Sequence, residues 1–293
     1  MGSLTGAANP FGQVSSATTP DARTLHYIAK DRGSDITVAF ESGLGCAHGL
    51  WALVQPDIAR FANTVVYDRA GYGCSEADSA PRTVARLTDD LEVILDAASV
   101  WGARKFVIVG HSLGGLVAQY AAARRPECVA GLVLVDSIAL DVPQLHGLWY
   151  RTSLKAIDLS MRIAARVGLL QQVGGRFIDR ISPPGFADDI KGCEFTRAGG
   201  QARKREARGW LTTLDHDGVA AVSLPDLPAV VMSSTRVPKP MAKIQAALIA
   251  SHRSLADALP RGSHVILDCG HNIHLDEPSA VTAAVQQVVE SCM

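Results

Sequence analysis

The stretch that most limits the possible fold is VIVGHSLGG at residues 107–115, which holds Gly110, Ser112 and Gly114 in a G-x-S-x-G pattern. The apolar run that leads into it is typical of a strand covered on both faces, and the run that follows predicts a helix. A tight turn from strand to helix needs residues without bulky side chains, which explains the glycines. Such a turn lifts the Ser112 hydroxyl clear of the sheet, beside the first amides of the next helix.

Short apolar runs alternate with helical patterns along most of the chain. Strands are predicted at 24–29, 36–41, 64–68, 105–110, 131–136, 228–234 and 263–268, and helices at 84–98, 113–125, about 240–258 and 278–290. This alternation predicts an α/β fold with a mostly parallel, doubly wound sheet of about eight strands.

The alternation is interrupted between residues 143 and 222, where the pattern is helical and no strong strand is predicted. We expect these residues to form a helical cap inserted after the strand predicted at 131–136, which is the sixth of the expected eight or so strands. The cap would lie above the carboxyl ends of the strands, where open α/β sheets bind ligands. The core then consists of residues 23–142 and 223–293. Residues 1–22 are small, polar and contain Gly and Pro, so they predict a flexible arm.

Composition argues against several classes of function. The formal net charge is −1, which gives no reason to expect nucleic acid or an anionic membrane as a partner. The chain has neither a signal-peptide pattern nor an uncharged apolar run of the roughly 18 residues that a membrane span needs. Its 6 cysteines are scattered without a CxxC pair, so we expect reduced thiols in a cytoplasmic protein, with disulfides as the alternative. We expect a monomer or a homodimer.

The second distinctive stretch is DCGHNIHLDEP at residues 268–278, which contains His271 and His274. Two histidines three residues apart can bind a metal, pack in the core, or include a catalytic base. A metal site needs three or four ligands, and no H-E-x-x-H pattern or Cys/His cluster supplies the others. The stretch therefore favours a base, and we expect neither a metal nor another cofactor.

With these motifs the chain resembles the α/β-hydrolase superfamily from about residue 24 onward. More narrowly, it is similar to capped esterases and lipases that carry G-H-S-x-G-G. The stretch YDRAGYGCSE at residues 67–76 is similar to the D-x-x-G-x-G-x-S turn after the fourth strand of that family. The resemblance implies Ser112 as nucleophile and His271 as base, in the expected chain order.

The resemblance also implies an oxyanion hole made of two backbone amides. One donor is the amide after the nucleophile, that of Leu113. The other comes from the loop after the third strand, where Ser42-Gly43 replaces the usual His-Gly and Leu44 becomes the implied donor. Because both donors belong to the backbone, the replacement is compatible with a working site.

The acid that orients the histidine departs from the usual pattern. Most members carry it shortly after the seventh strand, but residues 228–240 contain no carboxylate. Some capped members place it after the sixth strand, where Asp136 ends the strand and Asp141 follows. We favour Asp136, and Asp141, a cap aspartate such as Asp215 or Asp217, or no acid at all stay as alternatives.

These residues predict a serine hydrolase (class EC 3.1.1) that cleaves an apolar carboxylic ester, lactone or related acyl bond. The alternatives are a ligand-binding receptor or weakly active relative on the same fold, and carbon–carbon bond hydrolysis or cleavage with the same triad. Further candidate substrate contacts are Gly43, Trp51, His111, Leu154, Ile157, Met161 and His274. Packing is the favoured role for Trp51, and His274 is expected to support the site or to pack beside it. The basic run 201–210 favours a solvated helix face over an anion site.

Overall fold

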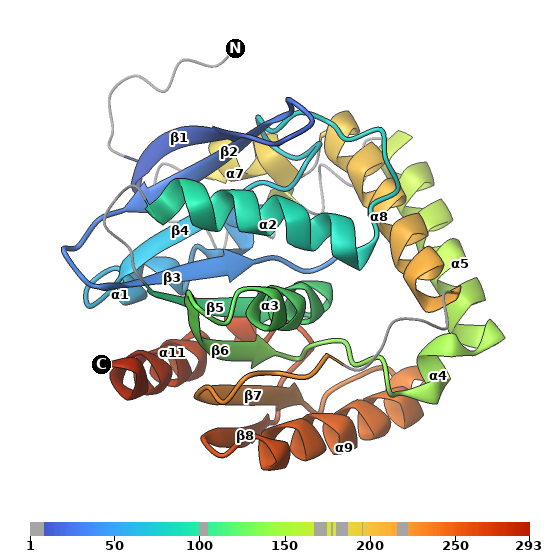
Figure 1. Ribbon diagram of the computed structural model, residues 1–293. Coiled ribbons are helices and arrows are strands. Elements are labelled where there is room, and N and C mark those ends of the chain that lie inside the picture. The colour runs from blue at the N-terminus through green and yellow to red at the C-terminus, as the bar shows by residue number, and fades with distance from the viewer. Residues whose placement is uncertain are drawn as a thin grey trace.

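The computed structural model describes residues 9–99, 105–166, 175–176, 178–179, 187–194, 196–215 and 222–293. Within these residues, eight strands form one sheet in the order β1-β2-β4-β3-β5-β6-β7-β8 (Figure 1). The strands are β1 (Gln13–Thr18), β2 (Thr24–Lys30), β3 (Ile36–Glu41), β4 (Asn63–Tyr67), β5 (Lys105–His111), β6 (Val129–Val135), β7 (Ala229–Ser234) and β8 (Gly262–Leu267). Strand β2 pairs antiparallel with β1 and β4, and all other neighbours pair parallel. The predicted fold class is confirmed.

Strand β1 corrects one sequence prediction. Its residues fall in the predicted arm 1–22, but they pair with β2 from Gln13 opposite Ala29 to Thr18 opposite Thr24. Within β1, Ala17 alone is buried. An edge strand is held by backbone pairing on one side and needs little apolar surface, so a run of small polar residues does not predict a strand there.

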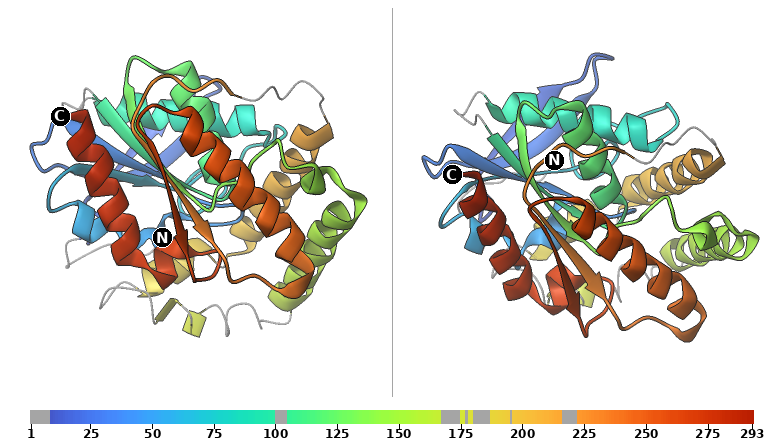
Figure 2. Two further views of the ribbon diagram at one scale, coloured as in Figure 1. Left: turned by 90° about the horizontal axis from the view of Figure 1, so that it is seen from below. Right: turned by 60° about the horizontal axis from the view of Figure 1, so that its bottom comes forward.

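Helices cover both faces of the sheet. They are α2 (Val84–Ser99), α3 (Leu113–Arg124) and α9 (Ala242–Ala258) on one face, and α1 (Gln55–Ile58) and α11 (Pro278–Cys292) on the other. Figure 2 shows β7 and β8 between α9 and α11. This is the two-sided cover that a parallel sheet requires, because both of its faces are apolar.

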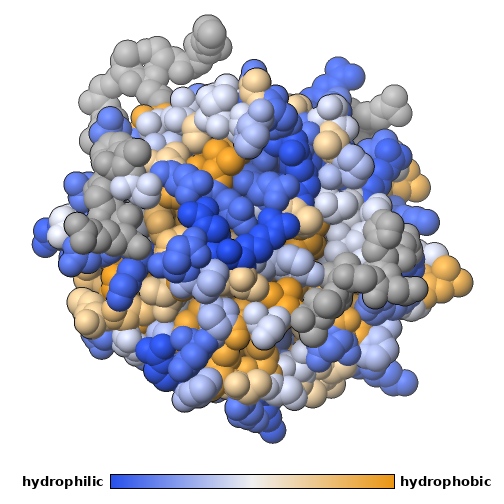
Figure 3. Space-filling view, in the orientation of Figure 1, coloured by the Kyte–Doolittle hydropathy of each residue, from blue (hydrophilic) through white to orange (hydrophobic). Residues whose placement is uncertain are grey.

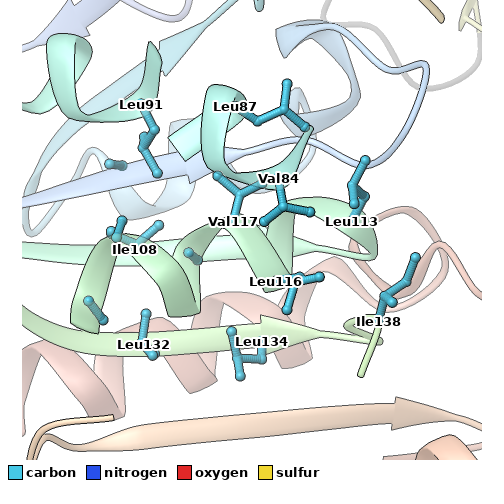
Figure 4. Close-up of a cluster of buried hydrophobic side chains, with 14 of the residues drawn as sticks. Val84, Leu87, Leu91, Ile108, Leu113, Leu116, Val117, Leu132, Leu134 and Ile138 are labelled. Carbon is cyan, nitrogen blue, oxygen red and sulfur yellow. The ribbon is translucent and has the colours of Figure 1, made fainter. Parts of the chain in front are cut away.

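The core follows from the two-residue repeat of the strands. Leu132 and Leu134 of β6 belong to the apolar cluster on the α3 face, whereas Val133 and Val135 belong to the cluster on the α11 face. Successive side chains of a strand point to opposite faces, so one apolar run supplies both layers. Figure 4 shows the first cluster, in which residues of α2 and α3 lie over β5 and β6.

Helix α2 has one apolar and one charged face, but Asp90, which its spacing places with the charged residues, is buried and pairs with Arg23 at 2.7 Å. Leu87 and Leu91 are buried in the core. Asp89 and Asp96 face outward and pair with Arg124, the last residue of α3, and with Arg125, which follows it, at 2.7 and 2.9 Å. In Figure 3 a band of hydrophilic residues crosses the middle of this face of the molecule, over α2.

The cap helices lie between β6 and β7 in the chain: α4 (Pro143–His146), α5 (Leu148–Arg166), α7 (Ala187–Glu194) and α8 (Arg197–Asp215). Helices α5 and α8 pack side by side, at the end of the sheet toward which the parallel strands run (Figure 1). The cap therefore lies at the carboxyl ends of these strands. Among the described helices, none has the length and apolar character needed to span a bilayer.

Candidate active site

Ser112 occupies a strained turn between β5 and α3. Its φ of 53° and ψ of −118° are a conformation that residues with a side chain seldom adopt. The flanking glycines are needed for space. A Cβ on Gly110 would lie 2.5 Å from the carbonyl oxygen of Gly114, and a Cβ on Gly114 would lie 2.3 Å from that of Glu41. The G-x-S-x-G pattern thus encodes a turn that displays Ser112.

The loop after β3 runs beside this serine. A Cβ on Gly43 would lie 2.6 Å from His111 Nδ1 and 3.4 Å from Ser112 Cβ. Leu44 follows in this loop, and Leu113 begins α3, where a helix amide has no partner within the helix. In the described part of the chain, neither the Leu44 amide nor the Leu113 amide donates a hydrogen bond. Both are available to a bound oxygen.

His271 and Asp136 form a hydrogen-bonded pair across the carboxyl end of the sheet. Asp136 directly follows β6 and His271 follows β8, and His271 Nδ1 lies 2.7 Å from Asp136 Oδ2. The Asp136 side chain is 1% exposed and that of His271 is 47% exposed. Asp136 has a φ of 44°, the left-handed region that aspartate tolerates better than most residues. The imidazole is therefore held from behind by a buried carboxylate and open in front.

The Asp136 carboxylate is fully hydrogen-bonded. Oδ1 accepts from the Ser234 amide at 3.1 Å and from Gln245 Nε2 at 3.0 Å, and Oδ2 accepts from Ser234 Oγ at 2.7 Å and from His271. Burial acts to raise the pKa of Asp136, but the hydrogen bond and charge of His271 and the donors of Ser234 outweigh it, so the pKa lies below its usual value. Asp136 therefore stays ionised at neutral pH.

The other candidate acids lie elsewhere. Asp141 accepts a hydrogen bond from Ser251 Oγ at 2.6 Å, and no contact joins it to His271 within the described residues. The side chain of Asp215 and all of Asp217 lie outside the described residues. At the end of β7, where the family's acid is usual, Ser234 supports Asp136 instead.

Ser112 Oγ has no hydrogen-bond partner in the described part of the chain, so no bond joins it to His271. Catalytic hydrogen bonds are often long in unliganded enzymes and tighten when substrate binds. Ser112 and the His271–Asp136 pair nevertheless share one end of the sheet, because β5 and β6 are neighbours.

Three of the candidate contact residues pack behind His271. His111 Nε2 donates to the carbonyl oxygen of His271 at 3.2 Å, and the His274 ring lies 4.5 Å from that of His111 and 4.7 Å from that of Trp51. Trp51 Nε1 donates to Ser42 Oγ at 3.0 Å. All three side chains are buried. From these positions the three side chains support the loop that carries His271 and the loop after β3.

Burial keeps the two supporting histidines neutral. It lowers the pKa of His274 to about 3, with a smaller contribution from the charge of His271. It also lowers the pKa of His111 well below the usual value, with the neighbouring His274 and His271 acting in the same direction. Of the nearby imidazoles, only His271 has an exposed side chain.

The cap candidates Leu154, Ile157 and Met161 lie on α5. Leu154 packs against the core cluster that includes Leu113, whereas Ile157 is half exposed. The side chain of Met161 lies outside the described residues. A separate cavity of about 260 Å³ lies at the opposite ends of the strands, near Lys105 and Arg261, and none of the candidate residues lines it.

Arg69 and Glu206 were not among the sequence candidates. Arg69 lies in the Gly-rich turn after β4, and Glu206 lies on α8 in the basic run 201–210. The prediction that this run is a solvated face is wrong for Glu206, which is fully buried and pairs with Arg69. The one sequence feature that could have pointed to the burial of Glu206 is that it is a single acid in a run of basic residues.

Comparison with known proteins places these motifs in a family. The profile of the "Alpha/beta hydrolase family" matches residues 42–285. A protein of Variovorax paradoxus named "Putative carbamate hydrolase RutD" is 30% identical over 233 residues, which cover 73% of this chain and 80% of that protein. A protein of the same name from Azorhizobium caulinodans is 31% identical over 115 residues, covering 39% of this chain and 42% of that protein.

Among solved structures, the enol-lactonase from Burkholderia xenovorans LB400 is similar with a TM-score of 0.64 and 23% identity, covering 94% of this chain and 100% of that chain. At this identity the likeness shows the fold alone. The matched part spans less than half of the Azorhizobium protein, so its name says nothing certain about this chain's substrate. The family match is much longer and includes both the Ser112 turn and His271, and this chain therefore belongs to the alpha/beta hydrolase family.

Proposed function

We propose that this protein is a serine hydrolase that cleaves a carboxylic ester, lactone or related acyl bond through a covalent acyl-enzyme. The observation that carries the proposal is the 2.7 Å hydrogen bond from His271 Nδ1 to the buried Asp136, beside the strained turn that displays Ser112. This bond fixes the tautomer that leaves His271 Nε2 free to accept a proton.

The reaction follows from these positions. His271 takes the proton of Ser112 Oγ as the oxygen attacks the substrate carbonyl, since a free hydroxyl is a weak nucleophile at neutral pH. The amides of Leu44 and Leu113 bind the oxyanion of the tetrahedral intermediate. His271 then protonates the departing alcohol oxygen. Water, deprotonated by the same imidazole, attacks the acyl-enzyme carbonyl, and His271 returns that proton to Ser112 Oγ as the acyl–oxygen bond breaks and the acid leaves.

Serine at position 112 also separates this proposal from related chemistries. Epoxide hydrolysis and dehalogenation on this fold need a carboxylate at that position. A carbamate is an acyl substrate that suits the same residues, and the relative that covers 73% of this chain is named as a carbamate hydrolase. Carbamates therefore belong beside esters and lactones as candidate substrates. A ligand-binding receptor and a carbon–carbon bond hydrolase are the remaining rivals.

A fluorophosphonate probe tests the nucleophile. We expect it to label the wild-type protein covalently and to leave Ser112→Ala unlabelled, with labelling read by intact-mass spectrometry. Absence of labelling of folded wild type would favour the receptor. Product analysis on esters, lactones, carbamates and β-diketones then distinguishes acyl-bond cleavage from carbon–carbon bond cleavage, and activity on β-diketones alone contradicts the esterase assignment.

A further inference from the structure

Arg69 is buried beside the active site with every donor occupied. Its Nε and Nη2 donate to the two oxygens of Glu206 at 2.7 and 2.9 Å, and Nη1 donates to Glu41 Oε1 at 2.8 Å. The remaining two N–H groups donate to the carbonyl oxygens of Ser42 and Gly43. A guanidinium has five N–H donors in a rigid plane, so this arrangement fixes the orientation of both carbonyls.

The Gly43 carbonyl belongs to the same peptide unit as the Leu44 amide. It accepts from Arg69 Nη2 at 2.7 Å and from the Cys46 amide at 3.2 Å. The C=O and N–H of a planar trans peptide point in opposite directions. Arg69 therefore directs the Leu44 N–H away from itself, in a loop that runs beside Ser112, since even an added Cβ on Gly43 would lie 3.4 Å from Ser112 Cβ.

The next peptide unit is held by the cap. Glu206 Oε2 accepts from the Gly45 amide at 3.1 Å and from the Tyr72 hydroxyl at 3.2 Å. Gly45 has a φ of 79°, which favours glycine there. The peptide units on both sides of Leu44 are thus anchored, one by Arg69 and the other by Glu206, and these two side chains form a bidentate ion pair.

We propose that Glu206 of cap helix α8, together with Arg69, is a positioning residue that aims the Leu44 amide at the oxyanion. The cap then takes part in transition-state stabilisation through the loop after β3, in addition to covering the site. Neither residue touches the reacting atoms. The inference rests on the proposed function, because it assigns the Leu44 amide to the oxyanion hole.

The test compares a substrate ester with its thionoester, in which sulfur replaces the carbonyl oxygen. Sulfur is a weak hydrogen-bond acceptor, so a well-aimed amide stabilises the oxygen anion far more than the sulfur anion. In Glu206→Gln we expect kcat for the ester to fall roughly tenfold or more with KM little changed, and kcat for the thionoester to change much less. The ratio of the two rates therefore falls.

Arg205→Ala is the matched control on the same helix. Arg205 Nη1 donates to the carbonyl oxygen of Asp78 at 2.6 Å, so its removal loosens the cap without touching the loop after β3. We expect this variant to keep the wild-type rate ratio. If Glu206→Gln does not fold, as judged by circular dichroism, Arg69→Lys carries the test, because lysine keeps the charge but cannot hold both carbonyls.

Equal losses on ester and thionoester, or no loss, would overturn the inference and leave Glu206 as a structural tie. The same holds if Arg205→Ala lowers the ratio as much as Glu206→Gln. A wild-type protein that neither hydrolyses esters nor reacts with fluorophosphonate would instead overturn the proposed function. The two failures are therefore distinguishable.

Discussion

Ser234 donates two hydrogen bonds to Asp136, one from its amide at 3.1 Å and one from its hydroxyl at 2.7 Å. Ser234 ends β7, the strand after which the family usually carries its acid, and Asp136 follows the neighbouring strand β6. The Asp136 carboxylate therefore takes two of its hydrogen bonds from the end of β7, the strand end where most members of the family carry the acid. These donors help to keep the buried Asp136 carboxylate ionised.

Replacement of Asp136 by asparagine tests the acid directly. An amide at this position can stabilise the wrong imidazole tautomer and no longer balances the imidazolium charge, so we expect kcat to fall roughly 10⁴-fold. The measurement is ester turnover together with a thermal melt, which should show a folded protein. Asp141→Asn is the matched control and should keep nearly full activity, because Asp141 bonds Ser251 instead. The reverse result would place the acid at Asp141.

Gln245 is predicted to hold the same carboxylate from α9. Its Nε2 donates to Asp136 Oδ1 at 3.0 Å and to the Ser234 carbonyl at 2.8 Å. Gln245→Leu keeps the volume but removes these donors from a buried anion, and the free energy of unfolding at neutral pH should fall by about 1.5–3 kcal/mol.

Loss of a donor to the carboxylate also raises the pKa of Asp136. A carboxyl whose pKa is lower in the folded state than in the unfolded state stabilises the fold at pH values above the unfolded pKa. This stabilisation is lost as the pH falls through the folded pKa. Acid unfolding of Gln245→Leu should therefore begin at a higher pH than that of the wild type. Denaturant titrations over a pH series measure both effects, and coincident curves for the two proteins would exclude this role.

Much of the fold and part of the candidate site follow from short patterns. The apolar runs predict the parallel strands because these are buried on both faces, and the glycines around Ser112 predict the turn because no other residue fits. Strand β1 is missed because an edge strand needs backbone pairing more than apolar residues.

Arg69 and Glu206 are missed for a different reason. They are separated by 137 residues in the chain, and neither belongs to a local motif that predicts its burial. A helix face with many arginines is usually solvated, and only the tertiary contact with the turn after β4 shows that Glu206 points inward. Long-range ion pairs of this kind leave no spacing in the sequence.

His274 should make the protein sensitive to mild acid. Its pKa is about 3 in the folded protein, and the usual value in an unfolded chain is about 6.5. Below about pH 6.5 the unfolded state binds the proton and the folded state does not, so stability falls by about 1.4 kcal/mol per pH unit from this group.

His274→Phe keeps a ring against Trp51 and His111 but cannot titrate. Between about pH 7.5 and about pH 5 the wild type should lose about 2 kcal/mol more stability than this variant. Urea unfolding of both proteins at the two pH values measures the difference directly. If both proteins lose the same unfolding free energy between the two pH values, His274 takes up a proton in the folded state as readily as in the unfolded state.

Gly43→Ala tests the close approach of the loop after β3 to the nucleophile. The added Cβ would lie 2.6 Å from His111 Nδ1 and 3.4 Å from Ser112 Cβ, so either the loop or the His111 ring must shift. Such crowding typically costs about 1–3 kcal/mol of stability. Because His111 supports His271 and the loop carries Leu44, we also expect kcat to fall roughly tenfold to a hundredfold.

Gly200→Ala on α8 is the control, since a Cβ there meets nothing within 4 Å. Alanine is a better helix former than glycine, so this variant should keep its kcat, and its free energy of unfolding should rise by up to about 1 kcal/mol. Steady-state kinetics and urea unfolding of the two variants test the pair, and a fully active Gly43→Ala would show that the loop is not held against Ser112 in solution.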